Sequence, residues 1–154
     1  MSVPELFGLV VGRCPGAVAV VDGVVELSYA ELDARSDVVA GFLVGCGVGV
    51  GDVVGLALPG SVGLVVAMLG VLKVGAAYLP LDPEYPVGRL VFMVGDACPV
   101  VVVGVDGWGL DGGCWVFRWW GCRRCCRGVR VLVLVRVRVL GLVGVWCRGV
   151  MRRM

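Results

Sequence analysis

The stretch from Leu72 to Pro86 constrains the fold of this chain more than any other part of its sequence. An apolar run with helical character ends at Lys73 and Gly75, and a helix C-terminus favours both a cation and a residue with positive φ. The apolar segment 76–79 then predicts a short buried strand. Asp82 and the prolines after it predict a rigid turn, from which a new helix begins at Pro86. The expected order is therefore helix, stop, buried strand, loop and helix.

The segments on either side of this stretch alternate in the same way. Ser2 and Ser28 each have a Glu three positions later and match a capping box, in which side chains satisfy the first free amides of a helix. Asp22-Gly23 predicts a hairpin turn, and Ser61 predicts a helix cap. Helices are expected at 4–13, from 28 to the glycines between 45 and 51, at 62–72 and at 86–97, and strands at 17–21, 24–27, 53–58, 76–79 and 99–103.

This alternation of strands and helices predicts an α/β fold, in which a sheet carries helices on both faces. On the helix that follows Ser28, one face is expected to be apolar and to pack inward: Tyr29, Leu32, Val39, Phe42 and Leu43. The other face is expected to be polar: Glu31, Asp33, Arg35 and Asp37.

Residues 53–72 carry no charge, and the chain as a whole is 59% hydrophobic. A membrane span is therefore one interpretation of this segment. Pro59-Gly60-Ser61 in its middle favours a buried strand followed by a core-facing helix, which produces the same hydropathy in a parallel sheet. We therefore predict no membrane span.

The chemistry-bearing side chains are few. The sequence contains no His, which excludes His-based acid–base and nucleophilic catalysis. Lys73 is the only Lys, and its place before the Gly stop favours a solvated ammonium that caps the helix end. Asp82 and Glu84 could form a metal pair, but their place between prolines favours turn and helix-start roles. Other carboxylates at expected turns or helix ends are Asp22, Asp52 and Asp96. We assign no catalytic, cofactor-binding or metal-binding residue.

The charge distribution divides the chain near Gly104. Residues 1–103 carry four basic and ten acidic residues, whereas residues 104–154 carry ten Arg and two Asp. We predict two regions with these bounds, the second irregular or disordered. The second region consists almost entirely of Gly, Val, Leu, Arg, Trp and Cys, whose codons can all be rich in G and C. We hypothesise a shift of reading frame after Val103, which translation of the gene in all three forward frames would test.

The second region allows further interpretations. A zinc site could use Cys122, Cys125 and Cys126 with Cys114 and Cys147, but no His and no second CxxC stand at the required spacing. The Arg and Trp residues could bind nucleic acid or an anionic membrane, although only nonspecifically. The alternation of residues 130–139 would permit a half-buried strand or an aggregating segment.

Two motifs in the first region carry a family resemblance. Leu27–Leu32 resembles the first core motif of the adenylation domains of nonribosomal peptide synthetases, and Leu72–Asp82 resembles the second. The flanking segments agree with the family in order and spacing: 17–23, 51–56, 82–86 and 89–99. The resemblance covers residues 1–103 and implies part of the large N-terminal subdomain of an adenylate-forming enzyme.

The resemblance implies a cytoplasmic enzyme of secondary metabolism, which activates an amino acid with ATP and Mg²⁺ as an aminoacyl-adenylate. The product passes to the phosphopantetheine thiol of a peptidyl carrier domain. The family's Ser/Thr/Gly-rich phosphate loop ending in Lys, its substrate pocket and its catalytic Lys domain are not found in this sequence. We therefore expect a truncated, catalytically silent fragment without a cofactor of its own, or one that complements a neighbouring polypeptide. We also expect strands such as 53–58 to present unpaired edges and the chain alone to aggregate.

Overall fold

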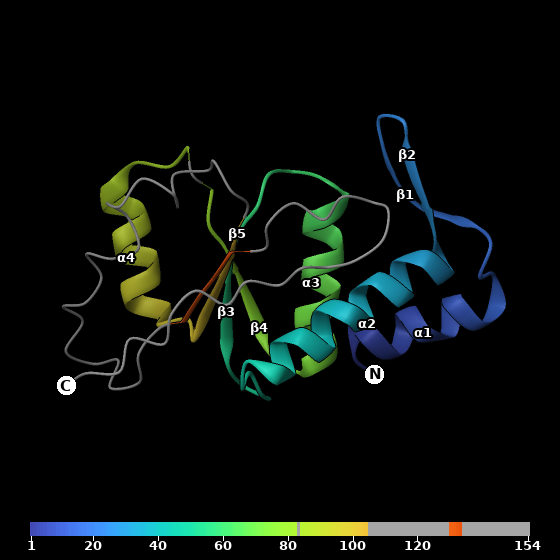
Figure 1. Ribbon diagram of the computed structural model, residues 1–154, viewed down its shortest axis with the longest axis horizontal. Coiled ribbons are helices and arrows are strands. Elements are labelled where there is room, and N and C mark those ends of the chain that lie inside the picture. Colours follow the sequence, from blue (N-terminus) through green and yellow to red (C-terminus); the bar gives the residue numbers. More distant parts are fainter. Residues whose placement is uncertain (83, 105–129, 134–154) are drawn as a thin grey trace. The chain divides into compact units, whose positions relative to one another are not determined.

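The computed structural model describes residues 1–82, 84–104 and 130–133, which form two compact units (Figure 1). Unit one comprises residues 1–52 and 59–78, and unit two comprises residues 53–58 and the described residues from 79 onward. Unit one contains α1 (Val3–Arg13), β1 (Val18–Asp22), β2 (Val25–Ser28), α2 (Tyr29–Gly45) and α3 (Val62–Val74). Unit two contains β3 (Val53–Ala57), α4 (Val87–Ala97), β5 (Val101–Gly104) and β6 (Arg130–Val133), and β4 (Ala77–Pro80) leads from the first unit into the second.

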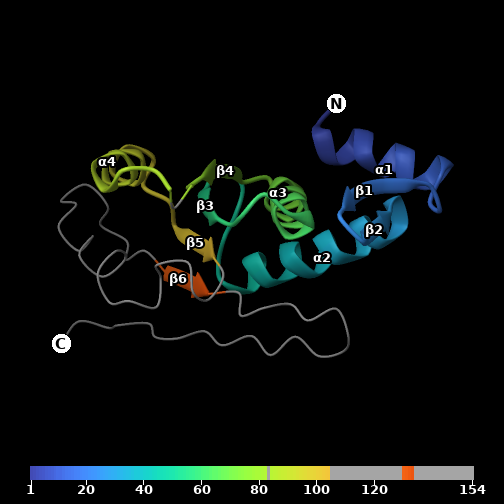
Figure 2. The same ribbon diagram turned by 90° about the horizontal axis from the view of Figure 1, so that it is seen from above.

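Unit one is built on the pairing of α2 with α3, which lie side by side in both views (Figures 1 and 2). The antiparallel hairpin of β1 and β2 adds its inward side chains to the same core. The buried members of this core are Leu27, Leu32, Val62, Val66 and Leu69, and the partly buried ones are Phe7, Ala19, Val20, Val39 and Val65. Burial of these apolar side chains is the main stabilising term of the unit.

The predicted helix ends of unit one are confirmed where they depend on residues within one turn of the helix end. Ser2 and Ser28 both form complete capping boxes, with Glu5 and Glu31 as the returning carboxylates. Gly75 ends α3 in the left-handed region with φ of 82°, as a helix stop requires. The helix boundaries therefore follow from short-range side-chain and backbone chemistry.

The hairpin turn lies one residue later than predicted. Asp22 pairs with Val25 as the last residue of β1, so the two-residue loop is Gly23-Val24 rather than Asp22-Gly23. Gly23 has φ of 60°, which a primed hairpin turn requires at its first central position. This shift leaves the Asp22 carboxylate outside the loop.

Unit two contains a four-stranded sheet in the order β4-β3-β5-β6. β3 pairs with β5 in parallel, with Val54 opposite Val101 and Leu56 opposite Val103, and all four of these side chains are buried. On the opposite face, Ala57 and Val102 form a core with Leu81. Helix α4 packs against this face through Leu90, Met93 and Val94. The prediction of strands buried on both faces is therefore confirmed for β3 and β5.

The mixed α/β architecture is confirmed, but two expectations about strands are wrong. β4 is not buried: Ala77 and Pro80 are exposed because this strand lies at an edge of the sheet. The segment 53–58 does not present an unpaired edge, because β3 lies between β4 and β5. That helices cover both faces of the sheet stays a prediction.

The uncharged segment 53–72 forms a strand, a turn and the first part of a 13-residue helix. Among the described residues, every helix is too short or too polar to cross a membrane. Part of the predicted strand in 130–139 is present as β6, which pairs with β5 in parallel. The Cys residues considered for zinc and most of the Arg and Trp residues of the second region lie outside the described residues.

Candidate functional site

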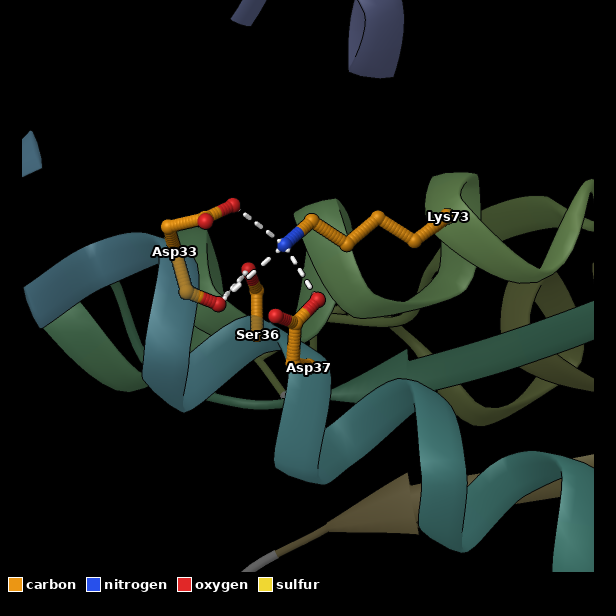
Figure 3. A network of polar contacts seen from close by, with 4 residues as sticks. All are labelled: Asp33, Ser36, Asp37 and Lys73. Atoms are coloured by element: carbon orange, nitrogen blue, oxygen red, sulfur yellow. Dashed lines mark hydrogen bonds and ion pairs between the residues drawn. The ribbon is translucent and has the colours of Figure 1, made fainter. Parts of the chain in front are cut away.

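The one Lys of the sequence is the centre of a polar network between α2 and α3 (Figure 3). The ammonium of Lys73 lies 2.6 Å from Oδ1 of Asp33 and 2.6 Å from Oδ1 of Asp37, and forms an ion pair with both. It also donates a hydrogen bond of 3.1 Å to the main-chain oxygen of Asp33. The ammonium also lies over the ring of Phe7, 5.9 Å from the ring centroid. The ammonium therefore donates hydrogen bonds to three oxygen atoms, all of them on α2.

The geometry corrects the expected role of Lys73. Lys73 does stand in the last turn of α3, as predicted, but its side chain is only 15% exposed and its ammonium is bound by two carboxylates rather than left to solvent alone. Asp33 and Asp37, predicted to line a polar outer face of α2, bind it instead. They lie four residues apart and so project from the same side of the helix.

The electrostatics of the network keep Lys73 charged. Burial lowers the pKa of Lys73, but hydrogen bonds to Asp33 and Asp37 raise it by more, so the pKa lies above its ordinary value of 10.5. An ammonium with a raised pKa has no free lone pair near neutral pH, so it serves neither as a base nor as a nucleophile. The chemistry available to this Lys is attraction of the two carboxylates, which ties α3 to α2.

Small residues allow the two helices to approach closely enough for the network to form. Ser36 is fully buried, and its hydroxyl donates a hydrogen bond of 2.8 Å to the main-chain oxygen of Asp33. Opposite it, a Cβ atom added to Gly70 would lie 3.1 Å from the main-chain oxygen of Ser36 and 2.6 Å from Cγ1 of Val39. Gly at position 70 is therefore required by packing.

A second long-range contact involves Asp22. Its Oδ2 accepts a hydrogen bond of 3.1 Å from the backbone N–H of Val62, the first residue of α3. Ser61 occupies the N-cap position but makes no capping hydrogen bond with its side chain; its hydroxyl donates to the main-chain oxygen of Pro59. Ser61 therefore occupies the predicted cap position, but the prediction that its side chain caps the helix is wrong. The carboxylate of Asp22 accepts the hydrogen bond from the first amide of α3 instead.

The remaining candidate carboxylates have local roles. Oδ1 of Asp82 accepts from the backbone N–H of Glu84, which confirms the predicted turn. Oδ2 of Asp52 accepts from the backbone N–H of Gly49, before β3 begins, and Asp96 lies in the last turn of α4. Within the part of the chain that the structure describes, no three Cys, Asp or Glu side chains gather as a metal site.

The sequence reasoning missed both long-range contacts, although a signal existed for one of them. Two Asp four residues apart on one helix and a single Lys elsewhere in an acidic region could have suggested an ion-pair cluster. No comparable signal marks Asp22 as the partner of Val62. Both contacts join elements of unit one that are far apart in the sequence.

Comparison with known proteins places this scaffold in a family. The AMP-binding enzyme family matches residues 9–116. The chain therefore belongs to the AMP-binding enzymes, and the predicted resemblance is confirmed.

The similar curated proteins are large nonribosomal peptide synthetases. The chain is 49% identical over 104 residues to CymA of Salinispora arenicola, a probable non-canonical synthetase, and this match covers 68% of the chain but 1% of CymA. It is 48% identical over 100 residues to the dimodular synthase of Bacillus subtilis, covering 65% of the chain and 4% of that protein. The chain thus spans only a few per cent of these relatives and corresponds to a segment of an adenylation domain.

The fold has a counterpart among solved structures. The N-terminal subdomain of NpsA from Klebsiella oxytoca, in complex with 3-hydroxybenzoyl-AMSN, matches with a TM-score of 0.64 and 24% identity. The match covers 67% of this chain and 26% of NpsA's. A second NpsA structure, an artificially fused adenylation–PCP di-domain with ThdA, matches with the same TM-score. That match covers 67% of this chain and 20% of the fused chain. These matches show the fold.

Proposed function

We propose that residues 1–103 are the N-terminal segment of an amino-acid-activating adenylation domain in a nonribosomal peptide synthetase. In its complete form such a domain joins an amino acid to AMP at the expense of ATP. The 49% identity to CymA over 104 residues supports this function, and the α/β scaffold described above is consistent with it. The segment contributes a framework rather than reacting groups.

We further propose that these 154 residues do not catalyse adenylation by themselves. The observation that carries this proposal is the state of Lys73. A phosphate-binding loop needs consecutive backbone amides and a cation aimed at the phosphates. The only Lys of the sequence is already bound by Asp33 and Asp37 and lies in a helix. ATP, Mg²⁺ and the amino acid would therefore be bound by parts of the domain outside this segment.

The proposed partners follow from the same assignment. The complete domain would pass its aminoacyl group to the phosphopantetheine thiol of a peptidyl carrier domain. The fused adenylation–PCP structure of NpsA supports a carrier domain as partner.

A second candidate function concerns residues 104–154. Their ten Arg against two Asp favour nonspecific binding to nucleic acid or an anionic membrane. Retention of a peptide of this region on heparin and on anionic vesicles, falling steeply with salt, would support this function. Equal retention at low and high salt would exclude it.

A chimeric enzyme tests the first proposal. Residues 1–103 would replace the matching segment in the adenylation domain of the Bacillus subtilis dimodular synthase, and amino-acid-dependent ATP–pyrophosphate exchange would be measured. We expect exchange with the amino-acid preference of the host domain, since the substituted segment supplies only scaffold. The host domain without any replacement segment is the negative control. A folded chimera without exchange, or with a new amino-acid preference, would contradict the proposal.

A further inference from the structure

Asp22 and Gly23 form an Asp-Gly pair at the exposed end of the hairpin of β1 and β2. In such a pair the backbone nitrogen of Gly can attack Cγ of the Asp side chain, because Gly carries no Cβ atom to obstruct the approach. The nitrogen loses its proton, one oxygen of the protonated carboxyl group leaves in a water molecule, and a five-membered succinimide ring forms. Water then opens the ring at either carbonyl, which gives back Asp or yields isoaspartate of the same mass. The reaction needs no co-reactant other than water.

Two contacts hold Asp22 away from this reaction. As the last residue of β1 it pairs with Val25, which keeps its backbone extended, whereas closure of the ring requires a ψ outside the extended range. Its Oδ2 accepts the hydrogen bond of 3.1 Å from the backbone N–H of Val62 on α3. The carboxyl group must leave this donor before Cγ reaches the nitrogen of Gly23. The hairpin therefore restrains the backbone of Asp22, and α3 restrains its side chain.

We propose that Asp22-Gly23 is an isomerisation site whose rate is controlled by the hydrogen bond between Asp22 and Val62. Asp22 and Gly23 are both exposed, and Val24 beside them is fully exposed. Access of water therefore does not limit the reaction, and the two restraints on Asp22 do. The proposal is independent of the proposed function, since it concerns only contacts within unit one.

The product of the reaction lacks the contact that slows it. In isoaspartate the chain runs through Cβ and Cγ, so the backbone gains one methylene group and the free carboxylate is attached to Cα. This change displaces both the pairing of Asp22 with Val25 and the acceptor of the Val62 N–H. A modified chain therefore loses the link between the hairpin and α3, and refolding does not restore it.

Val62→Pro tests the proposal, because it removes the hydrogen-bond donor and leaves the Asp-Gly pair unchanged. Val62 is the first residue of α3, a position that tolerates Pro, and Ser61 before it is already extended, with φ of −160° and ψ of 169°. Val62→Ala is the matched control, because it removes side-chain volume from the same core position but keeps the N–H.

The full 154-residue chain would be aged at neutral pH and digested with trypsin. Isoaspartate in the peptide 14–35 would be quantified by carboxyl methylation with a protein-isoaspartate methyltransferase. The pairs Asp106-Gly107 and Asp111-Gly112 lie in another tryptic peptide and do not contribute. We expect Val62→Pro to isomerise about fivefold faster than the wild type and Val62→Ala, the rate effect of one lost hydrogen bond. Equal rates for Val62→Pro and Val62→Ala overturn the proposal, and circular dichroism verifies that both variants keep their helix content.

Two measurements on the wild-type chain decide the matter if Val62→Pro does not fold. The first compares hydrogen exchange of the Val62 amide in the fresh chain and in the separated isoaspartate form. We expect faster exchange in the isoaspartate form, because the amide has lost its acceptor; unchanged protection overturns the proposal. The second compares the rate of isomerisation with and without urea. We expect a faster reaction in urea, and equal rates overturn the proposal because the fold then does not restrain Asp22.

Discussion

Gly70 on α3 lies so close to Val39 on α2 that a Cβ atom at residue 70 would be 2.6 Å from Val39 Cγ1. Carbon atoms in contact normally lie about 3.5–4.0 Å apart. A side chain at this position would therefore push the helices apart and weaken the packing on which unit one depends.

Gly70→Ala should accordingly destabilise the chain by about 1–3 kcal/mol, the usual cost of overpacking. Gly41→Ala is the control, because Gly41 is interior to α2 and has open space around an added Cβ within the described residues. Gly41→Ala should stabilise the chain by up to about 1 kcal/mol through helix propensity. Urea unfolding followed by circular dichroism measures both; equal effects would show that propensity alone governs these sites.

Removal of the Lys73 ammonium should leave two carboxylates facing each other. We expect Lys73→Met to cost about 1–2 kcal/mol, between the values of exposed and buried ion pairs, because Lys73 is mostly buried while Asp37 is exposed. Adding Asp33→Asn to this variant should recover part of the loss. If the double variant is as unstable as the sum of the single ones, Lys73 and Asp33 are not coupled.

The same network predicts an alkaline dependence of stability. The pKa of Lys73 in the folded chain lies above its ordinary value of 10.5, because hydrogen bonds to the two Asp outweigh the opposing effect of burial. Its contribution is therefore fully present below pH 10.5 and is lost as the pH rises through the folded-state pKa. Lys73→Met should remove this part of the alkaline loss. If Lys73→Met loses as much stability at alkaline pH as the wild type, the loss is caused by other groups.

Acid should weaken the start of α2. Hydrogen bonds from the backbone N–H and the hydroxyl of Ser28 lower the pKa of Glu31 below its ordinary value of 4.5. The stabilisation is present above pH 4.5 and is lost as the pH falls through the folded-state pKa. Glu31→Gln should flatten this part of the acid profile in urea unfolding. A profile unchanged by the substitution would contradict the role of the capping box.

The cap of α3 distinguishes a long-range contact from a local one. Asp22→Ala should cost about 1 kcal/mol, the typical value of a lost N-cap, since the N–H of Val62 loses its acceptor. Asp22→Asn keeps an acceptor and should cost less. Ser61→Ala should have a smaller effect than Asp22→Ala, because the Ser61 hydroxyl bonds to Pro59 rather than to a helix amide. If urea unfolding shows a larger loss of stability for Ser61→Ala than for Asp22→Ala, Ser61 and not Asp22 is the cap of α3.

The sequence predicted those parts of the fold whose causes are local. The capping boxes at Ser2 and Ser28 and the left-handed stop at Gly75 depend on residues within one helical turn. The parallel strands β3 and β5 were predictable because burial on both faces leaves a continuous apolar run. Local chemistry and hydrophobic pattern sufficed for these features.

The missed features join residues far apart in the chain. Lys73 and Asp22 each reach partners about 40 residues away, and nothing in the neighbouring sequence specifies such a partner. The exposure of β4 depends on its place at the edge of the sheet rather than on its own composition, which is apolar. These features are set by tertiary packing, so a pattern along the chain does not contain them.

The most direct test of the central claim is amino-acid-dependent ATP–pyrophosphate exchange by the purified 154-residue chain, with each of the common amino acids in turn. A scaffold segment whose single Lys is held between Asp33 and Asp37 should give only the background rate with every amino acid. Exchange above background that depends on one amino acid would contradict the claim, because the chain would then contain an ATP site of its own.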